Sequence, residues 1–343
     1  MKVKIGDLTK IKTGKLDANA SSEDGQYPFF TCSREPLKIS TYSYDCECVL
    51  VAGNGDLNVK YYNGKFDAYQ RTYIIEDNDS GKLFMPYLYY FMEGYIEELR
   101  KQAIGGVIKY IKLGNLTDAL IELPSVDEQK AIVDILEKSK KVLDMRHEEI
   151  SKLDDLIKAR FVELFGDPRS NPFGFEKKML KDTCKVITGN TPSRAIAEYY
   201  GDYIEWIKTD NIVSGILNPT QAIESLSEKG MNVGRTVEKD SILMACIAGS
   251  IASIGRVCIT DRTVAFNQQI NAVVPEQYNI LFLYVLLQMS KDYLVEDINM
   301  ALKGILSKSK LEEKEFIIPP MDLQEQFSDF VKQVDKSKFI RHY

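Results

Sequence analysis

A heptad pattern of apolar residues in the middle of the chain predicts one long helix. The apolar residues recur at alternating spacings of four and three, which is the pattern of a coiled-coil seam. Ser125 and Glu128 have the spacing of a capping box at the start, and Gly166 followed by Pro168 ends the helix. From Asp127 to Phe165 such a helix is roughly 58 Å long at about 1.5 Å per residue, which is longer than a compact domain.

A shorter copy of this helix is predicted at the end of the sequence. It ends at Tyr343, 17 residues before residue 360, where it would match the first helix. Because each helix needs an apolar partner, we expect the two to pack as an antiparallel coiled coil. The shortening predicts a rod that is paired over about half its length, with part of the 150–165 stripe exposed, and we interpret the chain as truncated, recombined or trimmed. The residues assigned to the coiled coil and to partner binding are Ile132, Leu136, Leu143, Ile150, Leu153, Ile157, Leu164, Phe327, Val331 and Val334.

Two blocks of sequence recur in the same order, which indicates a tandem duplication. Residues 4–14 align with 179–189 at an offset of 175, and residues 121–136 align with 316–331 at an offset of 195. The identical pairs include Gly14 and Gly189, Pro124 and Pro319, and Gln129 and Gln324. Each copy therefore consists of an irregular region followed by a helix.

The irregular regions are rich in predicted strands. Alternating runs of β-branched and aromatic residues indicate these strands, with Asn-Gly pairs at 54–55 and 63–64 as turns. An amphipathic helix is predicted at Met85–Lys101, and its counterpart at Ile280–Ile298. The predicted strands are Tyr27–Thr31, Cys48–Ala52, Lys60–Tyr62, Arg71–Ile75, Ile204–Lys208, Ser241–Ala245, Arg256–Thr260 and Ile270–Val274.

The predicted fold class is α+β, with two duplicated α/β domains separated by long helices that pair as an antiparallel coiled coil. The length of 343 residues suits two such domains of roughly 150 residues each. The expected boundaries are 1–124 for the first domain, 125–166 for its long helix, 167–319 for the second domain and 320–343 for the shortened helix.

Charge and composition narrow the classes of function. The 44 basic and 50 acidic residues give a net charge of −6, so the molecule lacks an overall basic field that would attract nucleic acid. Six cysteines without a CxxC pair and only two histidines argue against a zinc site and favour reduced thiols in a cytosol. We find no signal peptide and no run of about 18 apolar residues, so we expect no membrane partner.

Signatures of catalysis are missing from the sequence. It contains no P-loop and no GxSxG elbow, so we expect no catalytic residues and no metal. Instead, polar loops in each copy carry side chains that can bond base edges, beside glycines whose amides can reach phosphate. Such loops are more often ordinary surface turns, and Asn267-Gln268 equally fits an amide pair that holds the end of a strand. The candidates for DNA contact are Lys12, Thr13, Lys15, Ser33, Arg34, Asn54, Gln70, Arg71, Lys109, Asn190, Thr191, Lys208, Thr209, Asn211, Ser250, Arg256, Gln268 and Lys303.

Several short motifs accompany the duplication. Those in the first copy are Thr13-Gly14-Lys15, Tyr27-Pro28, Gly53-x-Gly55, Gly105-Gly106 and Leu123-Pro124-x3-Glu128-Gln129. Those in the second are Thr188-Gly189-x-Thr191-Pro192, Tyr200-Gly201-Asp202-x3-Trp206, Gly230, Ile254-Gly255, Asn267-Gln268, Lys303-Gly304 and Ile318-Pro319-Pro320-x4-Gln324. Each motif is weak alone, but together with the duplication they make the chain resemble the specificity subunit of type I restriction–modification systems over nearly its whole length. Residues that read bases differ between members of that family, so the resemblance does not assign them.

The resemblance implies a DNA-reading subunit without catalysis or cofactors of its own. Each of two target-recognition domains would read one half of a bipartite site in double-stranded DNA, while the helices set the spacing and dock two methyltransferase subunits. Those subunits would hold S-adenosylmethionine, and two restriction/motor subunits would use Mg and ATP, in the cytoplasm of a bacterium or archaeon. The alternative is a truncated or silent relative that binds methyltransferase without productive DNA recognition.

Overall fold

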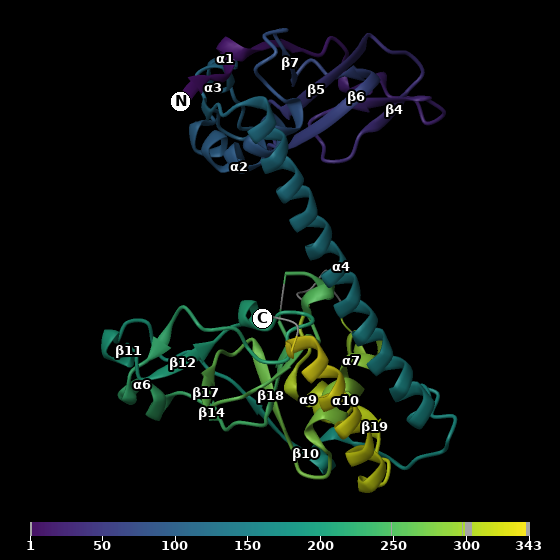
Figure 1. Ribbon diagram of the computed structural model, residues 1–343. Coiled ribbons are helices and arrows are strands. Elements are labelled where there is room, and N and C mark those ends of the chain that lie inside the picture. The colour runs from purple at the N-terminus through teal and green to yellow at the C-terminus, as the bar shows by residue number, and fades with distance from the viewer. Residues whose placement is uncertain (1, 248, 297, 299–303, 341–343) are drawn as a thin grey trace. The chain divides into compact units, whose positions relative to one another are not determined.

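The computed structural model describes residues 2–247, 249–296, 298 and 304–340, which form two compact units (Figure 1). Unit 1 comprises Met1–Met145 and unit 2 comprises Arg146–Tyr343. The division falls inside one continuous helix, α4 (Val126–Phe165). Each unit therefore holds a sheet domain together with part of this helix.

Unit 1 is built on a six-stranded mixed sheet. In sheet order its strands are β2 (Thr9–Thr13), β7 (Thr72–Asp77), β5 (Tyr44–Ala52), β6 (Val59–Ala68), β3 (Tyr27–Phe30) and β4 (Leu37–Ile39). β3 runs parallel to β6, and the other neighbours are antiparallel. A separate ribbon pairs β1 (Lys2–Lys4) with β8 (Leu120–Glu122). The other elements are α1 (Ile5–Leu8), η1 (Ala18–Ala20), α2 (Met85–Gln102) and α3 (Leu113–Thr117).

The central strand β5 is apolar on both faces because both faces of the sheet are covered. Val49 and Val51 belong to a core that includes the inner face of α2. Cys48 and Leu50, which alternate with them, belong to a second core around Phe66. Since side chains of a strand alternate between faces, the two cores together bury the whole second half of β5.

Unit 2 repeats this plan with the sheet divided in two. One sheet has the order β10 (Cys184–Thr188), β18 (Ile270–Pro275), β15 (Ile242–Ala245) and β16 (Val257–Ile259). The other has the order β11 (Tyr200–Gly201), β13 (Ser225–Leu226), β12 (Ile204–Ile207), β17 (Val264–Phe266) and β14 (Thr236–Val237), with β12 parallel to β17. A ribbon pairs β9 (Lys177–Met179) with β19 (Glu315–Ile317). The helices are α5 (Leu180–Thr183), η2 (Ala197–Tyr199), η3 (Thr209–Asn211), α6 (Glu228–Val233), η4 (Ile251–Ser253), α7 (Ile280–Met289), α8 (Lys291–Val295), α9 (Lys308–Glu312) and α10 (Met321–Ile340).

The predicted strands and the first amphipathic helix are confirmed. Each predicted strand overlaps an observed one, and α2 matches Met85–Lys101 to within one residue. The predicted turn at Asn63-Gly64 is wrong, because both residues lie within β6. Gly64 adopts a φ of 137° and still pairs with Cys46, so the strand continues through it.

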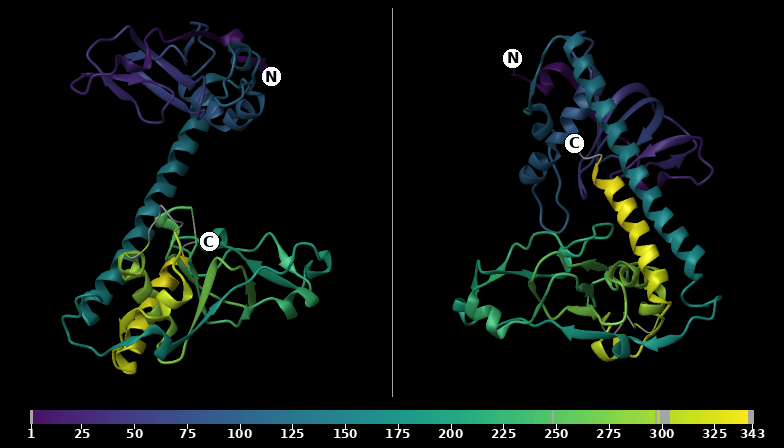
Figure 2. Two further views of the ribbon diagram at one scale, coloured as in Figure 1. Left: turned by 180° about the vertical axis from the view of Figure 1, so that it is seen from behind. Right: turned by 60° about the horizontal axis from the view of Figure 1, so that its bottom comes forward.

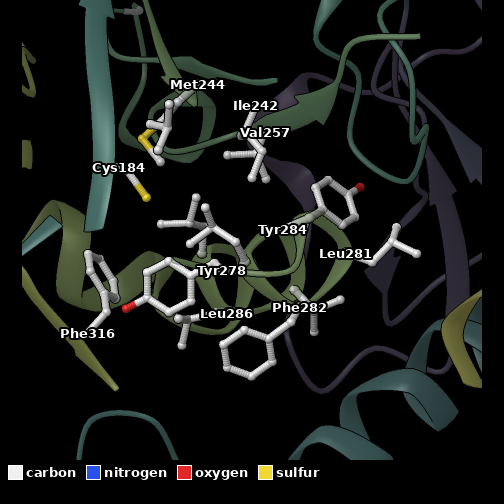
Figure 3. Close-up of a cluster of buried hydrophobic side chains, with 14 of the residues drawn as sticks. Cys184, Ile242, Met244, Val257, Tyr278, Leu281, Phe282, Tyr284, Leu286 and Phe316 are labelled. Atoms are coloured by element: carbon white, nitrogen blue, oxygen red, sulfur yellow. The ribbon is translucent and has the colours of Figure 1, made fainter. Parts of the chain in front are cut away.

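The prediction of one amphipathic helix over Ile280–Ile298 is wrong. The chain forms α7 and α8, which are separated at Ser290, and α7 buries every residue over Leu281–Leu287. Figure 3 shows side chains of α7 facing those of β15 and β16. On another side, Phe282 stacks on Phe161 of α4 with ring centroids 5.6 Å apart. A helix that is covered on several sides has no polar face, and therefore no amphipathic pattern.

Helix α4 begins and ends as the sequence predicts. The Ser125 N–H donates to Glu128 Oε2 at 2.9 Å, and the Glu128 N–H donates to Ser125 Oγ at 3.4 Å, which is the capping box. Gly166 has a φ of 71° and its N–H donates to the Val162 carbonyl at 2.8 Å. The 40 residues of α4 span about 60 Å. In the part of the chain that the structure describes, neither α4 nor any other helix combines the length and apolarity needed to cross a membrane.

In unit 2, the last turns of α4 pack antiparallel against α10 (Figures 1 and 2). Phe161 and Phe165 contact Phe327, with ring centroids 5.5 and 5.6 Å apart. Arg160 lies over Phe330, so positions along α4 fall as positions along α10 rise. The other seam residues in this core are Ile157, Val331 and Val334, with Leu153 and Leu164 partly buried. The predicted antiparallel pairing is confirmed.

The uncovered part of the seam is not where we predicted it. Part of the 150–165 stripe was expected to be exposed, but its residue Ile157 is buried, and Ile150, Leu153 and Leu164 are half-buried. Within unit 1, Ile132, Leu136 and Leu143 are instead 37%, 39% and 59% exposed. The reason is the direction of α10. This helix begins beside the C-terminal end of α4, so its first turns cover that stripe.

A buried glutamine ties the start of the long helix to the sheet domain in each unit. Gln129 accepts from the N–H before α2 at 2.8 Å and donates to the Pro124 carbonyl at 3.0 Å. Gln324 accepts from the N–H before α7 at 2.9 Å and donates to the Pro319 carbonyl at 2.8 Å. We call this arrangement the glutamine lock. It explains why these residues are identical in the two copies.

Candidate nucleic-acid interface

The candidate loops of unit 1 meet where two parallel strands end. β3 and β6 finish at Phe30 and Ala68, so their carboxyl ends lie side by side. The Tyr69 N–H donates to the Phe30 carbonyl at 2.9 Å, and the Gly53 N–H donates to the Arg71 carbonyl at 2.8 Å. These bonds join loops from distant parts of the sequence. Loop cluster 1 consists of residues 13–16, 31–35, 53–58, 69–71 and 104–111.

A short hairpin completes loop cluster 1. Ile104 and Tyr110 exchange two backbone hydrogen bonds of 3.0 and 2.9 Å, and the Gly55 N–H donates to the Lys109 carbonyl at 3.0 Å. Val107, at the tip, is fully exposed at 104%. The hairpin therefore presents an apolar tip beside polar loops, and backbone hydrogen bonds hold its base in place.

Unit 2 holds an equivalent set of loops with equivalent backbone bonds. The Asn267 N–H donates to the Ile207 carbonyl at 3.0 Å, again joining the ends of the parallel pair, β12 and β17. The Cys246 N–H donates to the Gln269 carbonyl at 2.8 Å, as Gly53 does in unit 1. Loop cluster 2 consists of residues 188–194, 208–211, 246–247, 249–256, 267–269 and 304–306.

The repeated pair Gly14 and Gly189 is required by close approach of the backbone. A Cβ atom on Gly14 would lie 2.2 Å from the Ala68 carbonyl oxygen, and one on Gly189 would lie 2.2 Å from the Asn267 carbonyl oxygen. Gly14 directly follows β2 and Gly189 directly follows β10, and each passes over the end of the parallel pair of its unit. No larger residue fits there without moving backbone.

Eight of the nine candidates from unit 1 lie in loop cluster 1. Arg34 Nε forms an ion pair with Asp56 Oδ2 at 3.2 Å, and Arg100 Nη2 forms one with Asp56 Oδ1 at 3.0 Å. These hydrogen bonds, led by that of Arg34, lower the pKa of Asp56. The exception is Lys12, which lies in β2 and pairs with Glu76. The eight are Thr13, Lys15, Ser33, Arg34, Asn54, Gln70, Arg71 and Lys109.

The described candidates from unit 2 all lie in loop cluster 2, but several bond within the unit. Asn211 is buried and its amide bonds two backbone groups. Arg256 donates to two backbone carbonyls, each at 3.2 Å, and Thr191 bonds Gln268. Lys303 lies outside the described residues. The set is Asn190, Thr191, Lys208, Thr209, Asn211, Ser250, Arg256 and Gln268.

The pair Asn267-Gln268 combines both of the roles considered for it. Asn267 is buried, and its side chain accepts from the Gln269 N–H at 3.1 Å, so it holds the end of β17. Gln268 is exposed. The structural interpretation therefore fits Asn267, and Gln268 keeps a side chain at the surface.

Sequence reasoning missed Arg194 and Glu224. Arg194 lies over the rings of Tyr200 and Trp206, at 4.4 and 5.2 Å from their centroids, and meets Glu224 at 2.6 Å. Lys208 meets Glu224 at 2.7 Å. Hydrogen bonds from Lys208 and Arg194 lower the pKa of Glu224. Trp206, the only tryptophan of the chain, could have drawn attention to this region. No local sequence pattern, however, predicts that an arginine contacts it.

The loop clusters offer hydrogen bonds and charge rather than reactive groups. Over the described residues, no three side chains of His, Cys, Asp or Glu are placed to hold a metal ion. Burial raises the pKa of Cys184, Cys246 and Cys258 to about 12, so these thiols stay protonated and unreactive. Exposed amides, hydroxyls and cations beside backbone N–H groups are suited to binding a polar polymer.

Repeated loop clusters and antiparallel helices define the class of this molecule as a duplicated two-domain protein. The chain belongs to the family of the type I restriction modification DNA specificity domain, whose sequence profile matches it twice, over residues 1–154 and 172–341. The resemblance inferred from the motifs is thereby confirmed.

Three curated relatives are type I restriction enzyme specificity subunits. The EcoDI subunit of Escherichia coli is 44% identical over 135 residues, which cover 39% of this chain and 30% of the relative. The HindI subunit of Haemophilus influenzae is 34% identical over 120 residues, covering 34% and 25%. The MjaIX subunit of Methanocaldococcus jannaschii is 26% identical over 271 residues, covering 72% and 61%. The aligned parts therefore span less than two thirds of each relative.

Solved structures share the fold along nearly the whole chain. The crystal structure of the type I restriction-modification S subunit from M. genitalium matches with a TM-score of 0.62 and 16% identity, covering 98% of this chain and 90% of that one. A chain from a structure on complex assembly and conformational transition of the type I R-M system matches with a TM-score of 0.55 and 16% identity, covering 99% and 91%. At this identity the likeness concerns the fold alone.

Proposed function

We propose that this chain is the DNA sequence-specificity subunit of a type I restriction–modification complex, in which each loop cluster reads one half of a bipartite site. The observation that carries the proposal is the repetition of the loop cluster, with equivalent backbone bonds, in both units. Two equivalent binding surfaces in one chain suit a site with two halves, because the spacing of half-sites follows protein geometry. Family membership and the names of the relatives support the same assignment.

In this proposal the helices set the spacing of the two half-sites and dock methyltransferase subunits. A continuous helix of 40 residues is a rigid element suited to a spacer. The exposed seam residues Ile132, Leu136 and Leu143 offer apolar side chains for a helical partner. Both roles belong to parts of the chain outside the loop clusters.

The chain acts in this proposal without catalysis of its own. Its partners are double-stranded DNA, two methyltransferase subunits and two restriction/motor subunits, in the cytoplasm of a bacterium or archaeon. S-adenosylmethionine, Mg and ATP belong to those subunits. Because this chain has a net charge of −6, the methyltransferase subunits supply much of the grip on DNA phosphates.

A domain exchange tests the two-reader arrangement. Residues 1–124 are replaced by the equivalent segment of another family member, and methylated adenines are mapped in cells that also carry the cognate methyltransferase. We expect one half of the methylated motif to change and the other half to persist. Loss of specificity in both halves would reject two independent readers.

A second measurement separates this function from that of a silent relative. The complex of chain and methyltransferase is tested for binding to DNA with and without the motif, in salt high enough to suppress phosphate-driven association. The proposal predicts preference for the motif. A complex that assembles but shows no preference would identify a silent subunit.

A further inference from the structure

Arg194 is a cation of loop cluster 2 whose side chain is held by two aromatic rings and a carboxylate. Its guanidinium lies over Tyr200 and Trp206, and one terminal nitrogen bonds Glu224 at 2.6 Å. The aromatic platform is fixed to the same loop, because the Trp206 indole N–H donates to the Asn190 carbonyl at 3.3 Å. The Tyr200 hydroxyl likewise donates to the Pro192 carbonyl at 2.7 Å. The loop, the two aromatic rings and the arginine are therefore connected by direct contacts.

The neighbouring cations are less available for binding. Arg256 uses two of its five N–H donors for backbone carbonyls of its own unit, one from Nε and one from a terminal nitrogen. The Lys208 side chain is 31% exposed, and its single charged group bonds Glu224 and lies 5.1 Å from the centre of the Trp206 ring. The Arg194 side chain is 56% exposed, and across the described residues Glu224 is the one hydrogen-bond partner of its guanidinium. Most of its five N–H donors thus have no hydrogen-bond partner within the described residues.

From this geometry we propose that Arg194 reads a guanine in the half-site bound by unit 2. The inference rests on the proposed function. A guanidinium presents a planar fork that matches the O6 and N7 acceptors of guanine in the major groove. Contact with the two rings and the hydrogen bond from one terminal nitrogen to Glu224 hold the guanidinium in place before DNA binds, so little side-chain entropy is lost on contact. Arg194 and Lys208 together outweigh Glu224 by one positive charge, which also favours DNA.

The chain contains a matched control for this arginine. Arg169 also meets a carboxylate, Glu296, at 2.6 Å and lies 5.8 Å from the centre of a tyrosine ring, Tyr293. Its side chain is 64% exposed. It differs in place, since it follows α4 and lies outside loop cluster 2. A substitution at Arg169 therefore removes the same kinds of contact, to a carboxylate and an aromatic ring, and leaves loop cluster 2 unchanged.

The test maps methylated adenines for the full chain with its cognate methyltransferase. Arg194→Lys keeps the charge and loses the fork, so we expect one guanine position in one half of the motif to become degenerate. Discrimination at that position should fall roughly 5- to 150-fold, as for loss of one bidentate base contact. Arg194→Ala should do the same and also lower total methylation, whereas Arg169→Lys should leave the motif unchanged. Each variant must first match the wild type in thermal unfolding and in co-purification with the methyltransferase.

The outcomes separate this inference from the function on which it rests. If the wild type methylates a defined motif and Arg194→Lys preserves every position, Arg194 is not a base reader while the proposed function stands. A uniform drop in methylation without degeneracy would assign Arg194 to a phosphate and would also overturn the inference. A wild type that specifies no motif would overturn the proposed function and this inference together.

Discussion

Unit 1 and unit 2 carry equivalent loops on equivalent parallel strands, but the helix behind the sheet is covered differently. In unit 1, α2 buries four apolar residues on one face, Met85, Leu88, Met92 and Leu99, and leaves a polar face outside. In unit 2, α7 buries every residue over Leu281–Leu287, because the sheet lies on one side and α4 and α10 pack on others. The paired helices are therefore part of the core of unit 2. The comparison shows that the duplication repeats the loop clusters and the glutamine lock more closely than it repeats the core.

The two loop clusters also share an electrostatic arrangement that the alignment of the copies does not show. Asp56 of loop cluster 1 bridges Arg34 of the same cluster and Arg100 of α2. Beside loop cluster 2, Glu224 bridges two residues of that cluster, Arg194 and Lys208. The carboxylates come from different parts of each domain, so the likeness is one of charge arrangement and not of sequence position. At both clusters an anion holds two cations close together at the surface.

The largest expected effect tests whether α4 is a core element of unit 2. Phe161→Ala removes a ring that touches Phe165, Phe282 and Phe327, and should destabilise unit 2 by about 3–5 kcal/mol. Leu143→Ala, on the exposed seam of the same helix, should change stability by no more than about 0.5 kcal/mol. Amide hydrogen exchange in α7 and β15 measures the free energy of opening unit 2. Equal protection in the two variants would contradict the assignment of α4 to this core.

A smaller effect tests whether the glutamine lock is equivalent in the two units. Gln129→Ala and Gln324→Ala each leave a backbone N–H at the start of a helix without its acceptor, at a cost of about 1–3 kcal/mol. We expect protection from hydrogen exchange to fall near α2 in the first variant and near α7 in the second. Gln221→Ala, at an exposed position of unit 2, serves as the control. A loss confined to one of the two lock variants would show that the copies use this residue differently.

The smallest effect concerns the charge arrangement of loop cluster 1. The pKa of Asp56 is lowered by its hydrogen bonds to Arg34 and Arg100, so the folded state favours its ionised form. Its contribution to stability is present above the unfolded pKa of about 3.9 and is lost as pH falls through the lower, folded value. Asp56→Asn should therefore differ most from the wild type near neutral pH and converge with it in acid. Thermal unfolding midpoints over this pH range check the sign, and divergence that grows in acid would refute it.

Much of the fold followed from local patterns in the sequence. The capping box at Ser125, the glycine stop at Gly166 and the heptad spacing between them located α4 to within a residue, because caps and periodicity depend on near neighbours. The duplication paired Gly14 with Gly189 and Gln129 with Gln324 before their contacts were known. The loops that gather at the parallel strands were also identified, although not every residue in them is free to bind.

The tertiary structure decided which parts of these patterns are covered and which groups meet. The seam alone could not show that α10 covers the end of α4, since that depends on the direction in which a distant helix begins. The apolar run of α7 indicates burial on several sides, but the sequence could not show which residues cover it, because the cover opposite the sheet comes from Phe161 and Phe327. Arg194 was missed for the same reason, since its platform and its carboxylate lie 6 to 30 residues away along the chain. The order of neighbouring residues determined the helices, the strands and their duplication, whereas contacts between residues distant in sequence determined the core and the side chains that meet at the loop clusters.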